Sequence, residues 1–440
     1  MRICVCAYDF PPVGGGRSYR MATYASHWAS LGHRVTVVSA GIDPWNADNP
    51  DHEQAEILAA QVDLFAVASP FSSLLWRWVG SGFVGKWLRR LRGITAVPDL
   101  GRLWASCAVK ALDSNHGTLW PFDWIVTSGP PHGVHAVGLK AQDRGVHWAA
   151  DFRDPLTDNR NYRPKSSWHE RADARFEKKV MEWADLLVAN TDGNLTTLTN
   201  HYPAVSNRVF HVPNGFDPRD LPKGNRQRLS ARRFRIVYLG TIRDYSQALR
   251  FFELFLDRYS EAAKHIELVH IGTRPFEGEV ADRMRMSNQL RYVGFLPRLE
   301  ALAMLDDFEM GLVILPRERE AARTVPGKAY QYLGHNLPVL SVAPEGDLLE
   351  ITREANGIAV DCEHLYTGAK ELSCAIDVWS AGSWPGRYTV NSGFVEKFRN
   401  DRLAAIWAER MVNISGVSGT CRCPEANEKV TELSRSVGDR

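Results

Sequence analysis

The sequence lacks long hydrophobic runs, a strong charge of one sign and a regular pattern of cysteines. None of its apolar runs approaches the roughly 20 residues that a membrane-spanning helix needs. The formal net charge is only +2, so the composition gives no general attraction to nucleic acid. The seven cysteines are odd in number and scattered, which predicts no disulfide framework and favours a reducing, cytoplasmic location.

A signal peptide and internal repeats are not indicated either. Residues 1–8 are too short an apolar stretch for a signal peptide, and they are expected to form a buried first strand. No repeat with the period of a solenoid stands out. The chain is long and rich in apolar residues. Its 440 residues, 44% of them hydrophobic, are enough for two well-packed domains.

Predicted strands and helices alternate along the chain, with glycines at the turns. Residues 3–7 and 35–39 have strand character, and residues 20–31 between them carry apolar side chains at helical spacing. Three glycines at 14–16 form the turn after the first strand, where doubly wound sheets bind ligands. A second alternation begins near residue 235. The sequence therefore predicts an α/β fold with two doubly wound, Rossmann-like domains that face a central cleft.

The predicted domain boundary is a polar, basic and turn-rich stretch after residue 215. The last helix is amphipathic and is expected to pack back toward the N-terminal domain, and a polar tail follows it. The predicted segments are an N-terminal domain (1–215), a linker (216–232), a C-terminal domain (233–392), a C-terminal helix (393–412) and a tail (413–440).

An insertion at 70–97 in the first domain has a different composition. Within it, residues 71–95 interleave apolar, aromatic and basic side chains at roughly helical spacing. This pattern is typical of a helix that lies on an anionic membrane. A helix that covers the first sheet, or a lid beside the substrate, would have the same pattern, and Gly80, Gly82 and Gly85 weaken any helix here. These interpretations stay open.

The run Pro326-Gly327-Lys328 is expected to open an apolar-faced helix. Free N–H groups and the positive end of the helix dipole attract phosphate, and Lys328 adds a full positive charge at that point. The glycine turn at 14–16 is a second phosphate-friendly loop, in the other half of the chain. The sequence therefore predicts a diphosphate bound across the cleft between the two domains.

Taken in order, the motifs of this chain resemble those of the GT-B glycosyltransferases, in the large retaining group called family 4 (group 1). Each motif alone is weak, whereas the ordered set is specific and covers roughly residues 1–360. The motifs lie at residues 11–16, 32–37, 128–132, 151–155, 212–217, 238–241 and 326–333.

The resemblance implies transfer of a sugar from a nucleoside diphosphate sugar to an acceptor, with the anomeric configuration retained. It implies that the nucleotide binds the C-terminal domain and the acceptor the N-terminal one. No metal and no cofactor is expected, because helix termini and a lysine would stabilise the charge on the leaving diphosphate. The sugar's transition state would be oxocarbenium-like.

The expected partners are the nucleotide-sugar donor and a saccharide or lipid-linked acceptor, without nucleic acid. By analogy with relatives, the setting would be cell-envelope, capsule or exopolysaccharide biosynthesis. The enzyme would be cytoplasmic, and residues 71–95 would associate it with the inner face of the cell membrane.

The resemblance also assigns residues. Lys328 matches the family's phosphate-binding lysine, and Arg153 stands where many relatives have a histidine close to the donor sugar. Arg243 is the cation nearest to the places where relatives carry two basic residues on the diphosphate. These three residues are the catalytic candidates. The expected nucleotide-sugar ligands are Gly15, Gly16, Gly240, Thr241, Gly272, Arg274, Phe295, Lys328 and Gln331, and the expected acceptor ligands are His132 and Asp154.

The chain departs from the family at several positions. Besides Arg153, Thr241 and Ser246 stand at or near the places of the two basic residues, and two more departures are Gln331 and Arg323. Gln331 replaces the glutamate that usually holds the ribose hydroxyls, so the side chain still accepts and donates hydrogen bonds but lacks the charge. Arg323 replaces an earlier glutamate, and it is expected to bind phosphate or a charged sugar, or to face solvent. The alternative function is a catalytically weakened relative that binds a nucleotide sugar. An epimerase and a dinucleotide-dependent oxidoreductase are less consistent with the motifs.

Overall fold

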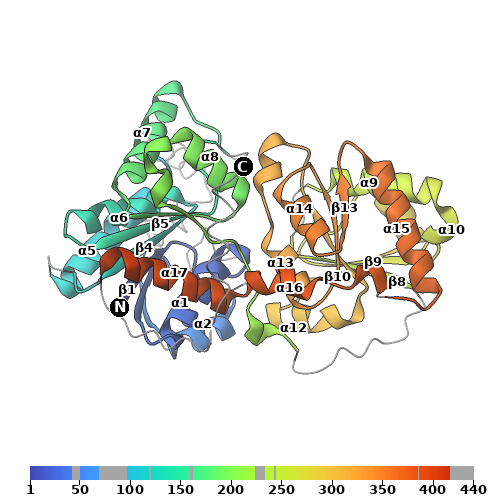
Figure 1. The fold of residues 1–440 in the computed structure, drawn as a ribbon, viewed down its shortest axis with the longest axis horizontal. Helices are drawn as coiled ribbons and strands as arrows, with labels where there is room; N and C mark the ends of the chain where they lie inside the picture. Colours follow the sequence, from blue (N-terminus) through green and yellow to red (C-terminus); the bar gives the residue numbers. More distant parts are fainter. Residues whose placement is uncertain are drawn as a thin grey trace, which may run out of the picture.

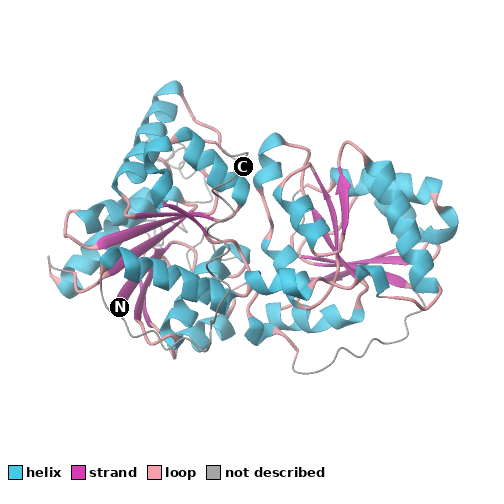
Figure 2. Ribbon diagram, in the orientation of Figure 1, coloured by secondary structure: helices cyan, strands magenta, loops and turns pink. Residues whose placement is uncertain are grey.

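The computed structural model describes residues 1–41, 50–68, 97–117, 120–158, 162–222, 233–241, 244–384 and 386–416. It shows two α/β units side by side (Figure 1). Each unit is built on one sheet with helices on both faces (Figure 2). Seven strands form the first sheet, in the order β3-β2-β1-β4-β5-β6-β7, and six form the second, in the order β10-β9-β8-β11-β12-β13. All the strand pairs are parallel, which confirms the predicted fold class.

In the N-terminal unit strands alternate with helices that cover the sheet. The strands are β1 (Arg2–Ala7), β2 (Arg34–Ser39), β3 (Asp63–Ala66), β4 (Trp124–Gly129), β5 (His147–Phe152), β6 (Leu186–Ala189) and β7 (Val209–His211). The helices are α1 (Gly16–Ser30), α2 (His52–Ala59), α5 (Gly101–His116), α6 (His135–Gln142), α7 (Ser167–Trp183) and α8 (Asp192–His201).

The C-terminal unit repeats this arrangement. Its strands are β8 (Phe234–Leu239), β9 (Ile266–Ile271), β10 (Leu290–Gly294), β11 (Met310–Ile314), β12 (Val339–Ala343) and β13 (Ile358–Asp361). Its helices are α9 (Ser246–Arg258), α10 (Ser260–Ala263), α11 (Glu279–Met286), α12 (Arg298–Ala303), α13 (Gly327–Gly334), α14 (Asp347–Glu354) and α15 (Leu365–Ser380). Two further helices, α16 (Ser392–Val395) and α17 (Asn400–Ser415), end the described chain.

The first strand shows why these segments fold as central strands. Ile3 and Val5 are fully buried on one face of β1, and Cys4 and Cys6 are fully buried on the other. A strand that is covered on both faces must be apolar throughout, as this one is. The strand order reverses between β1 and β4 in the first sheet and between β8 and β11 in the second. The carboxyl ends of strands at such a reversal form the usual ligand crevice of a doubly wound sheet.

The helix α17 returns from the C-terminal unit to complete the core of the N-terminal unit. Its Trp407 ring packs edge-on against Trp28 of α1, with 5.1 Å between ring centroids. The Trp28 Nε1 donates a hydrogen bond of 3.0 Å to the carbonyl of Ala404. A single helix over 393–412 was expected, and here the structure differs. Arg399 is extended and the neighbouring backbone pairs with Phe216, so α17 begins only at Asn400.

A buried ion pair fixes the carboxyl end of β5. Arg20 of α1 donates two hydrogen bonds to the carboxylate of Asp151, at 2.9 and 3.1 Å, and both side chains are almost completely buried. The same guanidinium donates to the carbonyls of Val212 and Pro213. The pair therefore joins α1, β5 and the segment that leads out of the N-terminal unit.

Several sequence predictions concern residues that the structure does not describe. The insertion at 70–97 lies almost entirely at 69–96, and most of the predicted tail and linker lie at 417–440 and 223–232, all outside the described residues. Within the described residues, no helix has both the length and the hydropathy that a membrane span requires.

Candidate functional site

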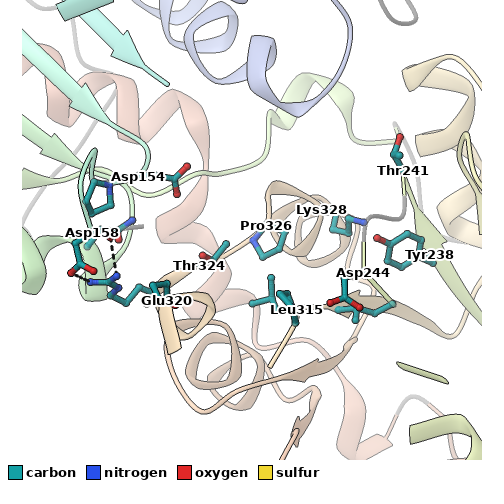
Figure 3. A pocket seen from close by; sticks show the side chains of 15 residues that line it. Asp154, Asp158, Tyr238, Thr241, Asp244, Leu315, Glu320, Thr324, Pro326 and Lys328 are labelled. Atoms are coloured by element: carbon teal, nitrogen blue, oxygen red, sulfur yellow. Dashed lines mark hydrogen bonds and ion pairs between the residues drawn. The ribbon is translucent and has the colours of Figure 1, made fainter. Parts of the chain in front are cut away.

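A cavity of about 280 Å³ lies between the two units. The loop after β5 and the start of α8 line it from the N-terminal unit, through residues that include Asp154, Asp158 and Asn194. The C-terminal unit contributes the carboxyl ends of β8 and β11 and the start of α13, as Figure 3 shows. The cavity therefore lies beside the carboxyl edges of both sheets, where the topology predicts a ligand.

Lys328 lines this cavity from the first turn of α13. Its Nζ lies 3.6 Å from the centroid of the Tyr238 ring, and no ion pair joins it to a carboxylate among the described residues. Burial lowers the pKa of Lys328 to about 7. Four buried side chains hold α13 against the sheet and so fix where the lysine stands: Ala329, Tyr330, Tyr332 and Leu333. A bound anion would stabilise the charged form of this buried lysine.

Two glycines allow the turn after β8 to approach Lys328. Gly240 has φ of +102°, which a side chain would strain, and a Cβ there would stand 3.7 Å from the Lys328 Nζ. A Cβ on Gly272 would lie 2.1 Å from the carbonyl oxygen of Gly240. The turn is held by a hydrogen bond of 2.8 Å between the hydroxyls of Thr241 and Thr273. Of the two predicted ligands in this turn, Thr241 lines the cavity, and Gly240 lies beside the Lys328 side chain without lining it.

Arg153 does not line the cavity. Its guanidinium donates hydrogen bonds to the carbonyls of Gly129 and Pro130, and to the carbonyl of Arg17 at 2.6 Å. Arg17 follows Gly15 and Gly16, whose Cα atoms face open space at the start of α1. In this structure Arg153 therefore positions the glycine turn beside the loop that carries Asp154.

His132 is almost completely buried, and neither ring nitrogen has a hydrogen-bond partner among the described residues. Burial, with the nearby His135 and Arg153, holds the pKa of His132 well below its usual range, so the ring is neutral. It lines a second cavity, of about 270 Å³, inside the N-terminal unit. Asp154 lines both cavities, so the two predicted acceptor ligands, His132 and Asp154, share the second cavity, and Asp154 also borders the first.

Arg323 reaches across the cleft instead of facing solvent. From the short 3-10 helix Arg319–Arg323 it donates hydrogen bonds to the Asp158 carboxylate, at 2.7 Å, and to the Thr197 hydroxyl, at 2.6 Å. Beside it, the Gly193 N–H at the start of α8 donates to the Asp347 carboxylate at 3.0 Å. These cross-cleft contacts join the units on one side of the cavity.

We expect that Arg323→Ala will loosen the two units. The substitution removes charge-assisted hydrogen bonds worth about 1.5–3 kcal/mol each. Small-angle scattering of the ligand-free protein should show a larger radius of gyration than the parent. Arg317→Ala is the matched control, because Arg317 pairs with Glu363 at the surface of the C-terminal unit alone. An unchanged radius of gyration in the Arg323 variant would show that the cross-cleft contacts of Arg323 do not hold the two units together.

The other predicted nucleotide ligands lie outside the cavity. Arg274 is exposed after β9, and Phe295 is exposed after β10, so both lie on the carboxyl edge of the second sheet. Gly272 is buried beside Gly240. Gln331 does not line the cavity, and its buried Oε1 has no hydrogen-bond partner among the described residues. Arg243 lies outside the described residues.

The structure adds acidic groups that sequence reasoning missed. Asp244 and Glu320 line the cavity, and Glu320 stands three residues before the place where the resemblance puts a glutamate. In the sequence, the feature that could have pointed to them is that Asp244 follows the motif at 238–241 and Glu320 precedes the motif at 326–333. Within the described part of the chain, no group of three or more His, Cys, Asp and Glu side chains is arranged to hold a metal ion.

The N-terminal unit is similar in sequence to a glycosyltransferase family, and the whole chain is similar in fold to solved glycosyltransferases. Residues 15–215 match the family model described as a glycosyl transferase 4-like domain. A search of curated protein sequences finds no significant match. Among solved structures, HepE of Anabaena in complex with UDP-glucose aligns with a TM-score of 0.60 and 12% identity, over 93% of this chain and 99% of that one.

Two further structures share the fold. WaaG, a glycosyltransferase involved in lipopolysaccharide biosynthesis, aligns with a TM-score of 0.54 and 14% identity, over 95% of this chain and 100% of that one. A UDP-N-acetylglucosamine 2-epimerase aligns with a TM-score of 0.53 and 11% identity, over 94% and 97% of the chains. Two parallel sheets face a common cleft, and these structural likenesses show that the chain has the GT-B fold. Its N-terminal unit is similar to glycosyl transferase 4-like domains.

Proposed function

We propose that this protein is a retaining glycosyltransferase that moves a sugar from a nucleoside diphosphate sugar to a saccharide or lipid-linked acceptor without a metal ion. The observation that carries the proposal is the position of the Lys328 side chain. Its ammonium lies at the start of α13, inside a cavity lined by both units, with no ion pair to a carboxylate among the described residues. HepE, which has this fold, was solved with UDP-glucose, and that supports a nucleotide-sugar donor.

The proposed chemistry depends on charge that develops during the reaction. As the bond from sugar to phosphate breaks, negative charge grows on the diphosphate, and Lys328 with the first N–H groups of α13 stabilises it. An adjacent phosphate also raises the pKa of Lys328 and so keeps it protonated. Asp244 and Glu320 accept hydrogen bonds from hydroxyls of the donor sugar.

The second cavity supports a separate place for the acceptor. The neutral His132 ring offers a donor and an acceptor to a sugar hydroxyl, and Asp154 adjoins both cavities. An acceptor hydroxyl near Asp154 would attack the donor sugar from the face that the diphosphate leaves, and its proton would pass to the departing phosphate. This route retains the anomeric configuration and needs no protein nucleophile. We place the reaction in cell-envelope polysaccharide biosynthesis, since WaaG, which shares the fold, is involved in lipopolysaccharide biosynthesis.

A thermal-shift screen followed by a turnover assay tests this proposal. One of UDP, GDP, ADP and dTDP should raise the melting temperature by mass action. The matching nucleotide sugars should then release nucleotide when a panel of acceptors is present, at a rate that EDTA does not change. Loss of turnover on chelation would contradict the metal-independent route, and absence of binding by every nucleotide would contradict the proposal.

A nucleotide-sugar-binding protein without turnover is the second candidate. Gln331 and Arg323 favour it, because one lacks the charge for a ribose contact and the other is engaged across the cleft. Binding in the thermal-shift screen without nucleotide release from any donor would support this candidate.

Nucleotide-sugar affinity should fall as the pH rises above about 7. In the free protein Lys328 has a pKa of about 7, so it is charged below that pH and mostly neutral above it. The bound diphosphate raises this pKa, so binding above pH 7 takes up a proton and weakens by up to about tenfold per pH unit. Calorimetry with the donor sugar at pH 6.5–9, in two buffers of different ionisation heat, measures the uptake. An affinity independent of pH in this range would contradict a lysine that titrates near 7.

A further inference from the structure

The outer face of α7 carries an unusual set of exposed side chains. Two exposed tryptophans stand at its ends, Trp168 with a relative exposure of 54% and Trp183 with one of 46%. No other tryptophan among the described residues is exposed to this degree. Four exposed cations lie between them on the same face: Arg171, Arg175, Lys178 and Lys179. At 100° per residue these six positions fall within one side of the helix, which we call the outer face of α7.

The opposite side of α7 is fixed in the N-terminal unit. Val180 and Met181 are fully buried in the core beside β5 and β6. Glu177 accepts hydrogen bonds from the N–H of Leu156, at 2.8 Å, and from the hydroxyl of Thr157. The helix therefore has one orientation, and its basic and aromatic side points away from the protein. In Figure 1, α7 lies at the upper edge of the N-terminal unit, remote from the C-terminal unit.

The outer face keeps a net positive charge. Within α7, which is described throughout, Glu182 is the one acidic residue on this side, and its carboxylate lies 3.7 Å from the Lys178 Nζ in an exposed pair. Lys179 lies 5.1 Å from the centroid of the Trp183 ring. The whole chain has a net charge of only +2, so this concentration of cations is local to the helix. A positive stripe on a nearly neutral protein attracts an extended anionic partner.

We propose that the outer face of α7 binds an anionic lipid surface. Cations on a helix bind anionic headgroups, and tryptophan is the side chain most typical of the boundary between water and hydrocarbon. Trp168 and Trp183 are 15 residues apart, which spans about 22 Å along one straight helix. Two tryptophans in line on either side of four cations fit a flat surface better than a grooved one, so a bilayer suits them better than a nucleic acid.

The position of α7 connects this surface to the second cavity. Arg163, Lys165 and His169, which line that cavity, lie just before or within the first turn of the helix. A protein docked through α7 would hold the mouth of the cavity near the lipid headgroups. If the proposed function holds, a lipid-linked acceptor would reach His132 from the membrane.

Vesicle flotation of the full chain tests the proposal. The parent should float with vesicles of phosphatidylcholine and phosphatidylglycerol at 7:3, but not with phosphatidylcholine alone, and salt should weaken the binding. Replacing Arg171, Arg175, Lys178 and Lys179 together by Gln should lower the affinity by roughly tenfold or more. The double variant Trp168→Ser and Trp183→Ser should also bind more weakly. All are surface positions, and an unchanged melting temperature confirms folding.

The matched control removes the same charge elsewhere. Arg258, Lys264, Arg283 and Lys370 are exposed on the C-terminal unit, and their joint replacement by Gln should leave vesicle binding unchanged. The proposal is overturned if the parent does not bind anionic vesicles, or if the α7 variant binds as well as the parent. It is also overturned if only neutralising the basic residues of 71–95 abolishes binding, or if α7 binds a DNA duplex more tightly than vesicles. No nucleotide is present, so failure here leaves the proposed function intact.

Discussion

Lys328→Ala should lower kcat/KM by about 100- to 1,000-fold, the loss expected when one preorganised group is removed from a developing anion. The lysine contributes a full charge at the start of α13, and the described part of the cavity has one other cation, Arg323, which is already paired with Asp158. The measurement is steady-state transfer with the donor sugar found by screening. The nucleotide-induced rise in melting temperature should shrink in the same variant.

Lys370→Ala is the control for this substitution. Lys370 is exposed on α15, so its loss changes net charge without touching the cavity. It should transfer sugar at the parental rate. A Lys328 variant that keeps its activity and its response to nucleotide would remove the basis of the proposed function.

Asp151→Ala should destabilise the N-terminal unit by about 3–5 kcal/mol, because it leaves the buried Arg20 guanidinium without its counter-charge. Asp151 accepts two hydrogen bonds from Arg20 and one, at 2.7 Å, from the Ser128 hydroxyl, so its removal takes away three hydrogen bonds. Equilibrium urea unfolding, followed by tryptophan fluorescence, measures the loss. Arg20→Ala should show a comparable loss, since it leaves the carboxylate buried.

An exposed ion pair in the same unit serves as the comparison. Arg2 pairs with Asp123 at 3.1 Å, and 54% of the Arg2 side chain is exposed. Such pairs contribute about 0–1 kcal/mol, so Arg2→Ala should change the unfolding midpoint little. Equal losses of unfolding free energy in Asp151→Ala and Arg2→Ala would show that burial does not decide how much these ion pairs contribute to stability.

The sequence predicts the parts of this protein that depend on local pattern. A short continuous apolar run such as residues 3–7 indicates a strand covered on both faces, and Pro326 and Gly327 indicate the helix start at Lys328. The order of the motifs then indicates the GT-B fold. These features need only neighbouring residues, and the structure has the strand, the helix start and the fold as predicted.

Contacts between distant residues could not be predicted in this way. Arg323 and Asp158 are 165 positions apart, and only the closure of the two units brings them together. Arg153 was expected at the donor sugar because of its place in a motif, but the carbonyls it binds belong to two other segments. The break before Asn400 depends on Phe216 in the same way.

A crystal structure with the nucleoside diphosphate selected by thermal shift would show directly whether Lys328 binds the diphosphate. We expect the β-phosphate at the N-terminus of α13, within hydrogen-bond distance of the Lys328 Nζ and between the two units, with no divalent cation on the phosphates. A diphosphate bound elsewhere, or held by a metal ion while Lys328 makes no contact with it, would rule out the proposed role of Lys328.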